Sequence, residues 1–166
     1  MISEKYRVLD IVPGTTVDGP GLRTSIYFAG CRHCCPGCHN PESWNFEAGR
    51  ELSAEEILGV IEENGFNVTL SGGDPLYLLP SLTPLVHEIK SRGYDLWIYT
   101  GFRYEEALCL PGFSELSPYI DVLVDGPFES DKRDISLLFR GSANQRLIDV
   151  RATLRAGEIV LWDDAF

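Results

Sequence analysis

Short apolar runs alternate with helical patterns along this 166-residue chain, and this alternation constrains its fold more than any other feature. The expected strands cover 24–28, 68–70, 96–99, 121–124 and 158–161. The expected helices cover 53–64, 82–92 and 105–108. A strand, a helix and a further strand in succession favour right-handed crossovers and a mostly parallel sheet. We therefore predict a single α/β domain over residues 1–166.

The length of the chain limits how this sheet is completed. A closed (β/α) barrel of eight strands takes about 250 residues, which is more than the chain has. We therefore predict an incomplete (β/α) barrel that is open on one side. Functional sites in such sheets form beyond the carboxyl ends of the strands. A cysteine-rich loop at 31–38 and the segments 72–74, 100–101 and 125–126 all follow expected strands, so we expect them on one rim.

The charge balance argues against two classes of partner. The chain has 25 acidic and 14 basic residues and a net charge of −11, whereas nucleic acid and anionic lipid attract basic surfaces. Residues 1–7 lack the basic and then apolar pattern of a signal peptide, and no run approaches the roughly 18 apolar residues of a membrane span. We therefore predict a cytoplasmic protein without nucleic-acid or membrane partners, in a compartment that disfavours structural disulfides.

Four of the five cysteines, Cys31, Cys34, Cys35 and Cys38, lie in one short loop and indicate a metal site. Zinc sites usually separate two cysteine pairs by a longer loop, and a thioredoxin-like dithiol needs only two cysteines. An iron–sulfur cluster tolerates tight spacing because its thiolates bind separate irons. Three thiolates would leave one iron open to a small chelating molecule, and four would permit a closed cluster. The spacing alone does not decide between these arrangements.

Several ordered motifs resemble those of a known family. Cys31-x-x-x-Cys35-x-x-Cys38 resembles the signature of radical S-adenosylmethionine enzymes. Residues 16–23 resemble the substrate-side segment of glycyl-radical activating enzymes, and 71–76 resemble their methionine-binding turn. Residues 123–128 and 139–146 are similar to the activating components of anaerobic ribonucleoside-triphosphate reductases. The resemblance extends from about residue 10 to residue 150 and implies a barrel of the radical S-adenosylmethionine type.

The resemblance also implies an activity. Cys31, Cys35 and Cys38 would hold one 4Fe–4S cluster, whose open iron binds S-adenosyl-L-methionine. Such an oxidoreductase cleaves S-adenosylmethionine reductively to a 5′-deoxyadenosyl radical, which removes hydrogen from a glycine of the partner. The implied partners are the large glycyl radical subunit of anaerobic ribonucleotide reductase and a low-potential electron donor such as flavodoxin or ferredoxin.

The family motifs assign further residues to the site. Asp18 would face the incoming glycine loop as the catalytic residue, and Arg23 could pair with Asp18 or with the partner's main chain. The residues expected at the cofactor are Gly37, Cys38, His39, Gly72, Gly73, Asp74, Thr100 and Asp125. Glycine at 72 and 73 lets the backbone approach a ligand closely. For Thr100 and Asp125, at strand ends, we expect contacts to the ribose or to a cation, and His39 could instead cover the cluster.

Some alternatives stay open at this point. Cys34 occupies a position that the family motif leaves free, and it is either a spare thiol or a fourth ligand that the cofactor displaces. Arg140 and Arg146 are either surface charges or residues that orient the C-terminal segment or the partner. Cys109 is expected to pack as a small hydrophobe. The chain could also activate a different glycyl radical enzyme, act on a metabolite as a 7-deazapurine-type synthase, or be a non-catalytic zinc or iron–sulfur adaptor.

Overall fold

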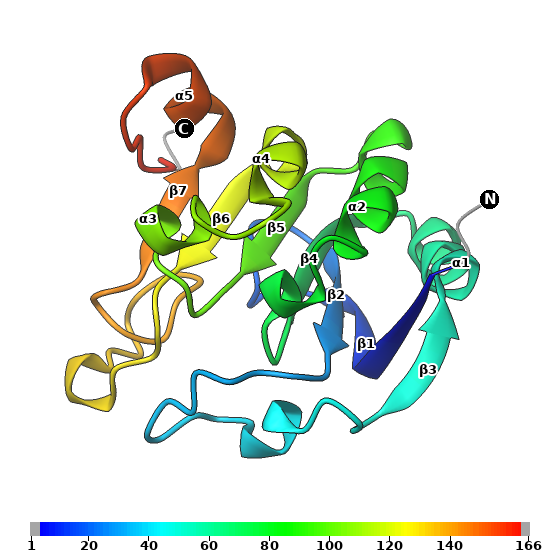
Figure 1. Cartoon of the computed structure of the whole chain (residues 1–166), viewed down its shortest axis with the longest axis horizontal. Coiled ribbons are helices and arrows are strands. Elements are labelled where there is room, and N and C mark those ends of the chain that lie inside the picture. Colours follow the sequence, from blue (N-terminus) through cyan, green and yellow to red (C-terminus); the bar gives the residue numbers. More distant parts are fainter. Residues whose placement is uncertain (1–3, 164–166) are drawn as a thin grey trace.

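A computed structural model describes residues 4–163 as a seven-stranded sheet with helices packed on one face (Figure 1). The strands are β1 (Lys5–Thr15), β2 (Arg23–Phe28), β3 (Arg50–Ser53), β4 (Asn67–Gly72), β5 (Leu96–Tyr99), β6 (Val122–Asp125) and β7 (Arg146–Asp149). The helices are α1 (Ala54–Asn64), α2 (Leu82–Ser91), α3 (Tyr104–Ala107), α4 (Phe113–Leu116) and α5 (Val150–Ala156). Short 3-10 turns cover Pro41–Trp44, Pro75–Leu78, Ser117–Tyr119 and Ser130–Lys132.

The sheet is mixed, with strand order β3-β1-β2-β4-β5-β6-β7. Its four central strands, β2, β4, β5 and β6, are parallel, as predicted. The outer strands β1, β3 and β7 pair antiparallel, so the prediction of a mostly parallel sheet was wrong for the flanks. The physical reason is that β1–β2 and β6–β7 are joined without a crossover helix, and such connections permit antiparallel neighbours. Within the described residues the order runs from β3 to β7 as an open sheet.

The helices that precede and follow β4 form where the sequence predicts them. Ser53 caps α1 and accepts a hydrogen bond from the Glu56 N–H, while the Glu56 side chain accepts from the Ser53 N–H. Gly65 ends this helix in the left-handed conformation at φ 69°. The apolar side of α2 is completely buried, and it consists of Leu82, Leu85, Val86 and Ile89.

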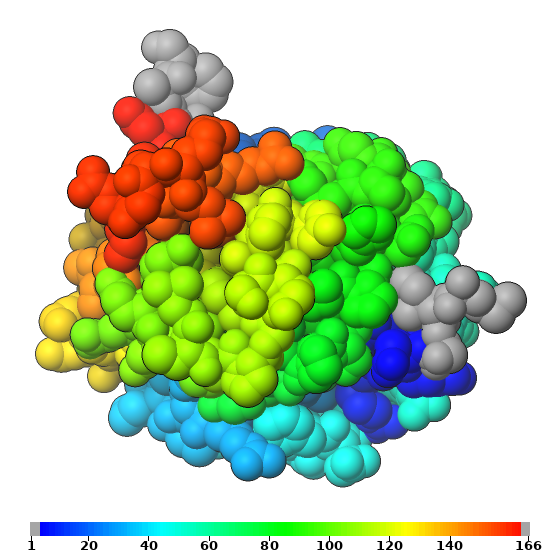
Figure 2. All heavy atoms as spheres, turned by 45° about the horizontal axis from the view of Figure 1, so that its top comes forward, coloured from blue at the N-terminus to red at the C-terminus, as the bar shows by residue number. Residues whose placement is uncertain are grey.

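The two faces of the sheet are covered differently. Alternate residues of each strand point to opposite faces, and one face carries the main core, where Ile26, Leu70 and Ile98 pack under the helices. Figure 2 shows this helical layer, with the light-blue segment that contains the cysteine loop along its lower edge. On the opposite face Trp97 packs in a smaller cluster with Phe139 from the loop before β7. Around Trp97, the face opposite the helices is therefore covered by a loop.

The end of the chain differs from the prediction. The expected strand at 158–161 makes a single bridge, between Leu161 and Ile148 of β7. The turn after α5 accounts for this, because the Val160 N–H donates to the Thr153 hydroxyl at 2.9 Å. Among residues 4–163, no helix combines the length and apolar character needed to cross a membrane. Residues 1–3, part of the segment compared with signal peptides, lie outside the described residues.

Candidate functional site

The carboxyl ends of the parallel strands and the cysteine loop meet at one edge of the sheet (Figure 1). A cavity of about 240 Å³ opens there. Seven residues predicted to belong to the site line it, namely Cys31, Cys35, Cys38, His39, Gly72, Gly73 and Thr100. The segments that follow β2, β4 and β5 thus contribute to one hollow.

The four clustered cysteines differ in their position relative to the cavity. Cys31, Cys35 and Cys38 line the cavity, whereas Cys34 is exposed beside it with a φ of 51°. Within residues 4–163, no three His, Cys, Asp or Glu side chains converge closely enough to hold one metal ion. A 4Fe–4S cluster requires less convergence, because each thiolate binds a different iron. Three of the four clustered thiols thus line one cavity, as the predicted three-thiolate cluster requires.

Burial changes the acidity of two of these thiols. It raises the pKa of Cys31 to about 11, with smaller contributions from the neighbouring Asp74 and cysteines. Burial also raises the pKa of Cys35. Both groups are thiols at neutral pH in the metal-free chain, so binding of iron must release protons.

The glycine turn after β4 packs directly against the start of the cysteine loop. The Gly73 N–H donates to the Phe28 carbonyl at 2.7 Å, and the Asp74 N–H donates to the Gly30 carbonyl at 2.9 Å. A Cβ at Gly72, where φ is 103°, would lie 2.3 Å from the backbone nitrogen of Phe28. A Cβ at Gly73 would lie 2.5 Å from the Gly30 carbonyl oxygen. Glycine is therefore required at both positions, whatever ligand the cavity takes.

Asp74 lies behind the cavity wall rather than on it. The residue is 1 % exposed, and Oδ2 accepts hydrogen bonds from the Thr100 hydroxyl and the Gly101 N–H, both at 2.9 Å. Oδ1 accepts from the Leu76 N–H at 3.0 Å. His33 completes the set, with its Nε2 2.6 Å from Oδ2. The Asp74 carboxylate was predicted to bind cofactor, but in this structure it hydrogen-bonds to other groups of the protein.

His33 is the site residue that the sequence reasoning missed. It lines the cavity, and its ring lies 4.5 Å from that of Phe102 and 5.3 Å from that of Tyr77, measured between centroids. The sequence did contain a signal for this residue. His33 lies between two expected cluster ligands, and Asp74 follows the next expected strand. The cavity wall also includes Tyr99, from the expected strand at 96–99, and Phe128, from the motif at 123–128, neither of which was predicted to belong to the site.

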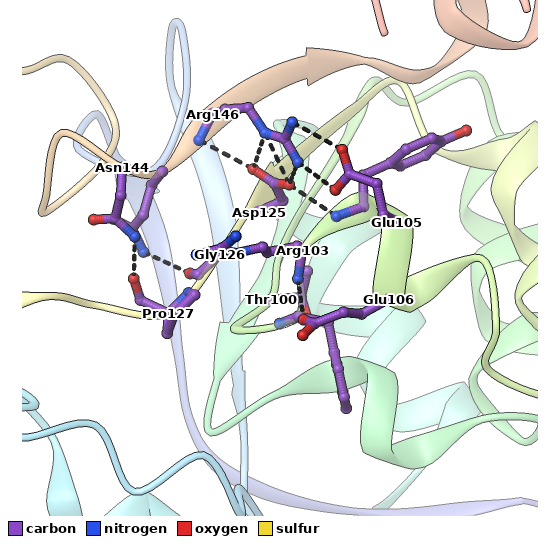
Figure 3. Close-up of polar contacts among 12 residues, drawn as sticks. Thr100, Arg103, Glu105, Glu106, Asp125, Gly126, Pro127, Asn144 and Arg146 are labelled. Atoms are coloured by element: carbon purple, nitrogen blue, oxygen red, sulfur yellow. Dashed lines mark hydrogen bonds and ion pairs between the residues drawn. The ribbon is translucent and has the colours of Figure 1, made fainter. Parts of the chain in front are cut away.

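Asp125 ends β6 and does not line this cavity, and its carboxylate points toward Arg146 (Figure 3). Its carboxylate pairs with Arg146, whose Nη2 lies 2.5 Å from Oδ2, and also accepts the Tyr104 N–H at 2.8 Å. Glu105 contacts the same guanidinium at 2.8 Å, and hydrogen bonds to both carboxylates raise the pKa of Arg146. Arg146, which begins β7, therefore orients the C-terminal strand. A second, polar cavity of about 500 Å³ lies beside these groups.

Asp18 lies outside the cavity, in the loop between β1 and β2. Its carboxylate accepts a hydrogen bond from the Tyr27 hydroxyl, and its main-chain carbonyl accepts from the Thr69 hydroxyl at 2.7 Å. Burial, and next the hydrogen bond to Asp18, raise the pKa of Tyr27. Arg23, for which pairing with Asp18 or with the partner's main chain was considered, is fully buried and instead pairs with Asp95 at 2.9 Å.

The remaining expectations have mixed outcomes. Gly37 lies outside the cavity wall and packs against the loop at 128–130, where a Cβ would be 3.4 Å from Ser130. His39 lines the cavity with its ring 5.2 Å from that of Phe128. Arg140 donates to the Gln145 carbonyl at 2.9 Å. Cys109 was expected to pack in the interior, but it is exposed just beyond α3.

Known proteins match this chain over most of its length. Residues 17–148 match the family described as "4Fe-4S single cluster domain". The "Anaerobic ribonucleoside-triphosphate reductase-activating protein" of Pasteurella multocida (strain Pm70) is 41 % identical over 145 residues, covering 80 % of this chain and 90 % of that protein. The protein of the same name from Escherichia coli (strain K12) is 35 % identical over 143 residues, covering 80 % and 92 %.

Among solved structures, that of QueE from Escherichia coli aligns with 58 % of this chain and 52 % of its own, at a TM-score of 0.49 and 21 % identity. The family assignment rests on the sequence matches, which cover most of both chains. They confirm the predicted 4Fe–4S cluster and the resemblance that the motifs indicated. This chain belongs to the family of anaerobic ribonucleoside-triphosphate reductase-activating proteins and contains a 4Fe–4S single cluster domain.

Proposed function

We propose that this chain activates an anaerobic ribonucleoside-triphosphate reductase, as a radical S-adenosylmethionine oxidoreductase. One observation carries the proposal: the three thiols of the motif and the glycine pair line one cavity, in a chain that aligns with nine-tenths of an activating protein. Cys31, Cys35 and Cys38 are the proposed cluster ligands. S-adenosylmethionine is proposed to lie in the same cavity, against Gly72 and Gly73.

The chemistry supplied by the bound groups is reductive cleavage of S-adenosylmethionine to methionine and a 5′-deoxyadenosyl radical, which takes hydrogen from a glycine of the reductase. The chain itself orients the reactants and keeps water away. The two glycines admit a ligand close to the backbone, and Thr100, just after β5, forms part of the wall while its hydroxyl is bonded to Asp74. The aromatic rings of Tyr99 and Phe128 form part of the wall and favour a dry cavity.

The partner surface and the setting complete the proposal. Asp18 belongs to the loop at 16–22, from which Val17 projects with 68 % of its surface exposed, and we place the reductase glycine segment at this loop. The flank of an incomplete (β/α) barrel is the proposed entry for that segment. A low-potential donor such as flavodoxin or ferredoxin would supply the electron. A reducing, cytoplasmic setting without oxygen suits the five free cysteines and an accessible cluster.

Anaerobic reconstitution with iron and sulfide, followed by reduction with dithionite, tests the proposal. We expect a brown protein that converts S-adenosylmethionine to 5′-deoxyadenosine and, after mixing with the reductase, produces a glycyl radical signal by electron paramagnetic resonance. Cleavage without the glycyl radical would favour a different glycyl radical enzyme or a metabolite-acting enzyme. A colourless, zinc-loaded protein would favour the non-catalytic adaptor and contradict the proposal.

A further inference from the structure

His33 links the cysteine loop to the edge of the sheet. The residue stands between two proposed cluster ligands in the chain, yet its ring reaches the buried carboxylate of Asp74, with Nε2 and Oδ2 2.6 Å apart. The His33 side chain is 15 % exposed, and that of Asp74 is fully buried. Hydrogen bonds to a charged acceptor in such surroundings are among the stronger ones in proteins.

The space that the ring occupies is created by the residue opposite it. A Cβ at Gly101 would lie 2.5 Å from the His33 ring, so a side chain at that position would displace the ring. Phe102 meets the ring edge-on, at an interplanar angle of 77°. The ring is therefore placed both by its hydrogen bond and by close packing.

Asp74 makes this contact while it is also bonded to three other positions of the site. Its N–H donates to Gly30 at the start of the cysteine loop, and its Oδ1 accepts from Leu76 in the turn after the glycine pair. Its Oδ2 accepts from Thr100 at the end of β5. Asp74 thus joins the cysteine loop, the glycine turn and the end of β5. It does not line the cavity itself.

We propose that His33 and Asp74 form a positioning pair, which sets the cysteine loop at a fixed distance from the cavity wall formed by the glycine turn and β5. The proposal rests on the proposed function, because it assigns the pair to a site shared by cluster and S-adenosylmethionine. Neither residue contacts the reacting atoms. Both act through the groups they hold, Cys31 and Cys35 on the loop and Thr100 on the wall.

Three substitutions of His33 separate the hydrogen bond from the packing. His33→Gln keeps an N–H donor that can reach Asp74, His33→Leu keeps an apolar group between the aromatic rings, and His33→Ala removes both. His87→Gln is the matched control, since His87 is an exposed histidine on α2 that packs on Tyr119, away from the site. Circular dichroism establishes which variants are folded.

The first measurement uses the metal-free chain and does not depend on activity. Trypsin cleaves after the exposed Arg32, next to His33. The rate, divided by the rate for a short peptide with the same residue after Arg32, reports how often the cysteine loop leaves the sheet. We expect cleavage about tenfold faster in His33→Leu and His33→Ala, because one buried hydrogen bond is lost. His33→Gln and His87→Gln should match the unmodified chain.

The second measurement uses the reconstituted protein with dithionite and without reductase. We expect the leucine and alanine variants to raise the KM for S-adenosylmethionine about tenfold while kcat changes less, as one lost hydrogen bond allows. The change that S-adenosylmethionine makes in the electron paramagnetic resonance spectrum of the reduced cluster should be weaker in these variants and restored by His33→Gln.

Equal trypsin rates in all variants would overturn the positioning pair, and so would failure of His33→Gln to restore the rate and the KM. These outcomes are distinct from failure of the proposed function. If the unmodified chain did not cleave S-adenosylmethionine, the proposed function would fail, whereas the trypsin rates of the metal-free chain would still decide the link between His33 and Asp74.

Discussion

Asp74 and Asp125 follow parallel strands at the same edge of the sheet, and each is 1 % exposed, yet they stabilise different parts of the molecule. Asp74 accepts from a histidine, a hydroxyl and backbone N–H groups, and it joins the parts of the cavity wall. Asp125 pairs with Arg146 and anchors the C-terminal strand β7 (Figure 3). The comparison teaches that a strand end places a carboxylate on the rim, while the elements around it decide what it binds.

The largest effect is expected from Asp74→Ala. The substitution leaves the Thr100 hydroxyl, the Gly101 N–H and His33 without their acceptor, so we expect unfolding free energy to fall by about 3 kcal/mol. Iron content after reconstitution should fall as well, because the cysteine loop loses its link to the sheet. Chemical denaturation and iron analysis check both effects, with the exposed Glu63→Ala on α1 as control. Unchanged iron content in Asp74→Ala would show that iron binding does not depend on Asp74, and the two aspartates would then not differ in this respect.

Asp125→Ala should destabilise the chain by about 2 kcal/mol, because Tyr104 and Arg146 lose a buried acceptor. The cost is smaller than for Asp74 because the Arg146 side chain is 31 % exposed and can be hydrated. Since Asp125 lies outside the first cavity, iron content should stay at the level of the unmodified chain. A variant that is stable but cannot hold iron would show that the two carboxylates share one role.

Substitutions of Arg146 separate its contact with Asp125 from its contact with Glu105. Arg146→Lys keeps the charge but loses the fork that reaches both Asp125 and Glu105, and we expect a loss of about 1 kcal/mol. Arg146→Ala should lose slightly more, with a dependence on salt concentration because Glu105 is exposed. Thermal unfolding at low and high salt measures both, and equal melting temperatures for the three proteins would contradict this account.

The smallest effect is expected at Cys34. Because this thiol is exposed outside the cavity, Cys34→Ala should keep its iron content and change stability by less than about 0.5 kcal/mol. Cys34→Gly should stabilise the chain by roughly 0.5 to 1 kcal/mol, since a φ of 51° suits glycine better. Iron analysis decides the role of the thiol: loss of the cluster in Cys34→Ala would make it a ligand.

The fold was predictable where the chain alternates strand and helix. Periodicity placed β4, β5 and β6 and the helices α1 and α2, because their buried faces repeat regularly. The flanking strands could not be found in this way. In β1 the stretch at 10–14 is mostly exposed and includes Pro13, and β7 has only one fully buried residue, Ile148. Such strands form because a neighbour supplies hydrogen bonds, which a single sequence does not reveal.

The site was predictable in part for a related reason. Thiols and glycines carry their function in their residue type and spacing, and those predicted at 31, 35, 38, 72 and 73 line the cavity. The direction of an aspartate depends on distant partners. His33 precedes Asp74 by 41 residues, and Arg146 follows Asp125 by 21. No local pattern links such pairs, so the different partners of the two carboxylates could not be predicted from the sequence.

The contact between Gly101 and the His33 ring has a consequence for the evolution of this family. A Cβ at position 101 would lie 2.5 Å from the imidazole ring of His33, so the two groups cannot be present together. The two positions are 68 residues apart in the chain. Related sequences should therefore change the two positions together, and a chain with alanine or a larger residue at 101 should have lost the ring at 33. An alignment deep enough to count these pairs would display the contact as covariation, without any structure.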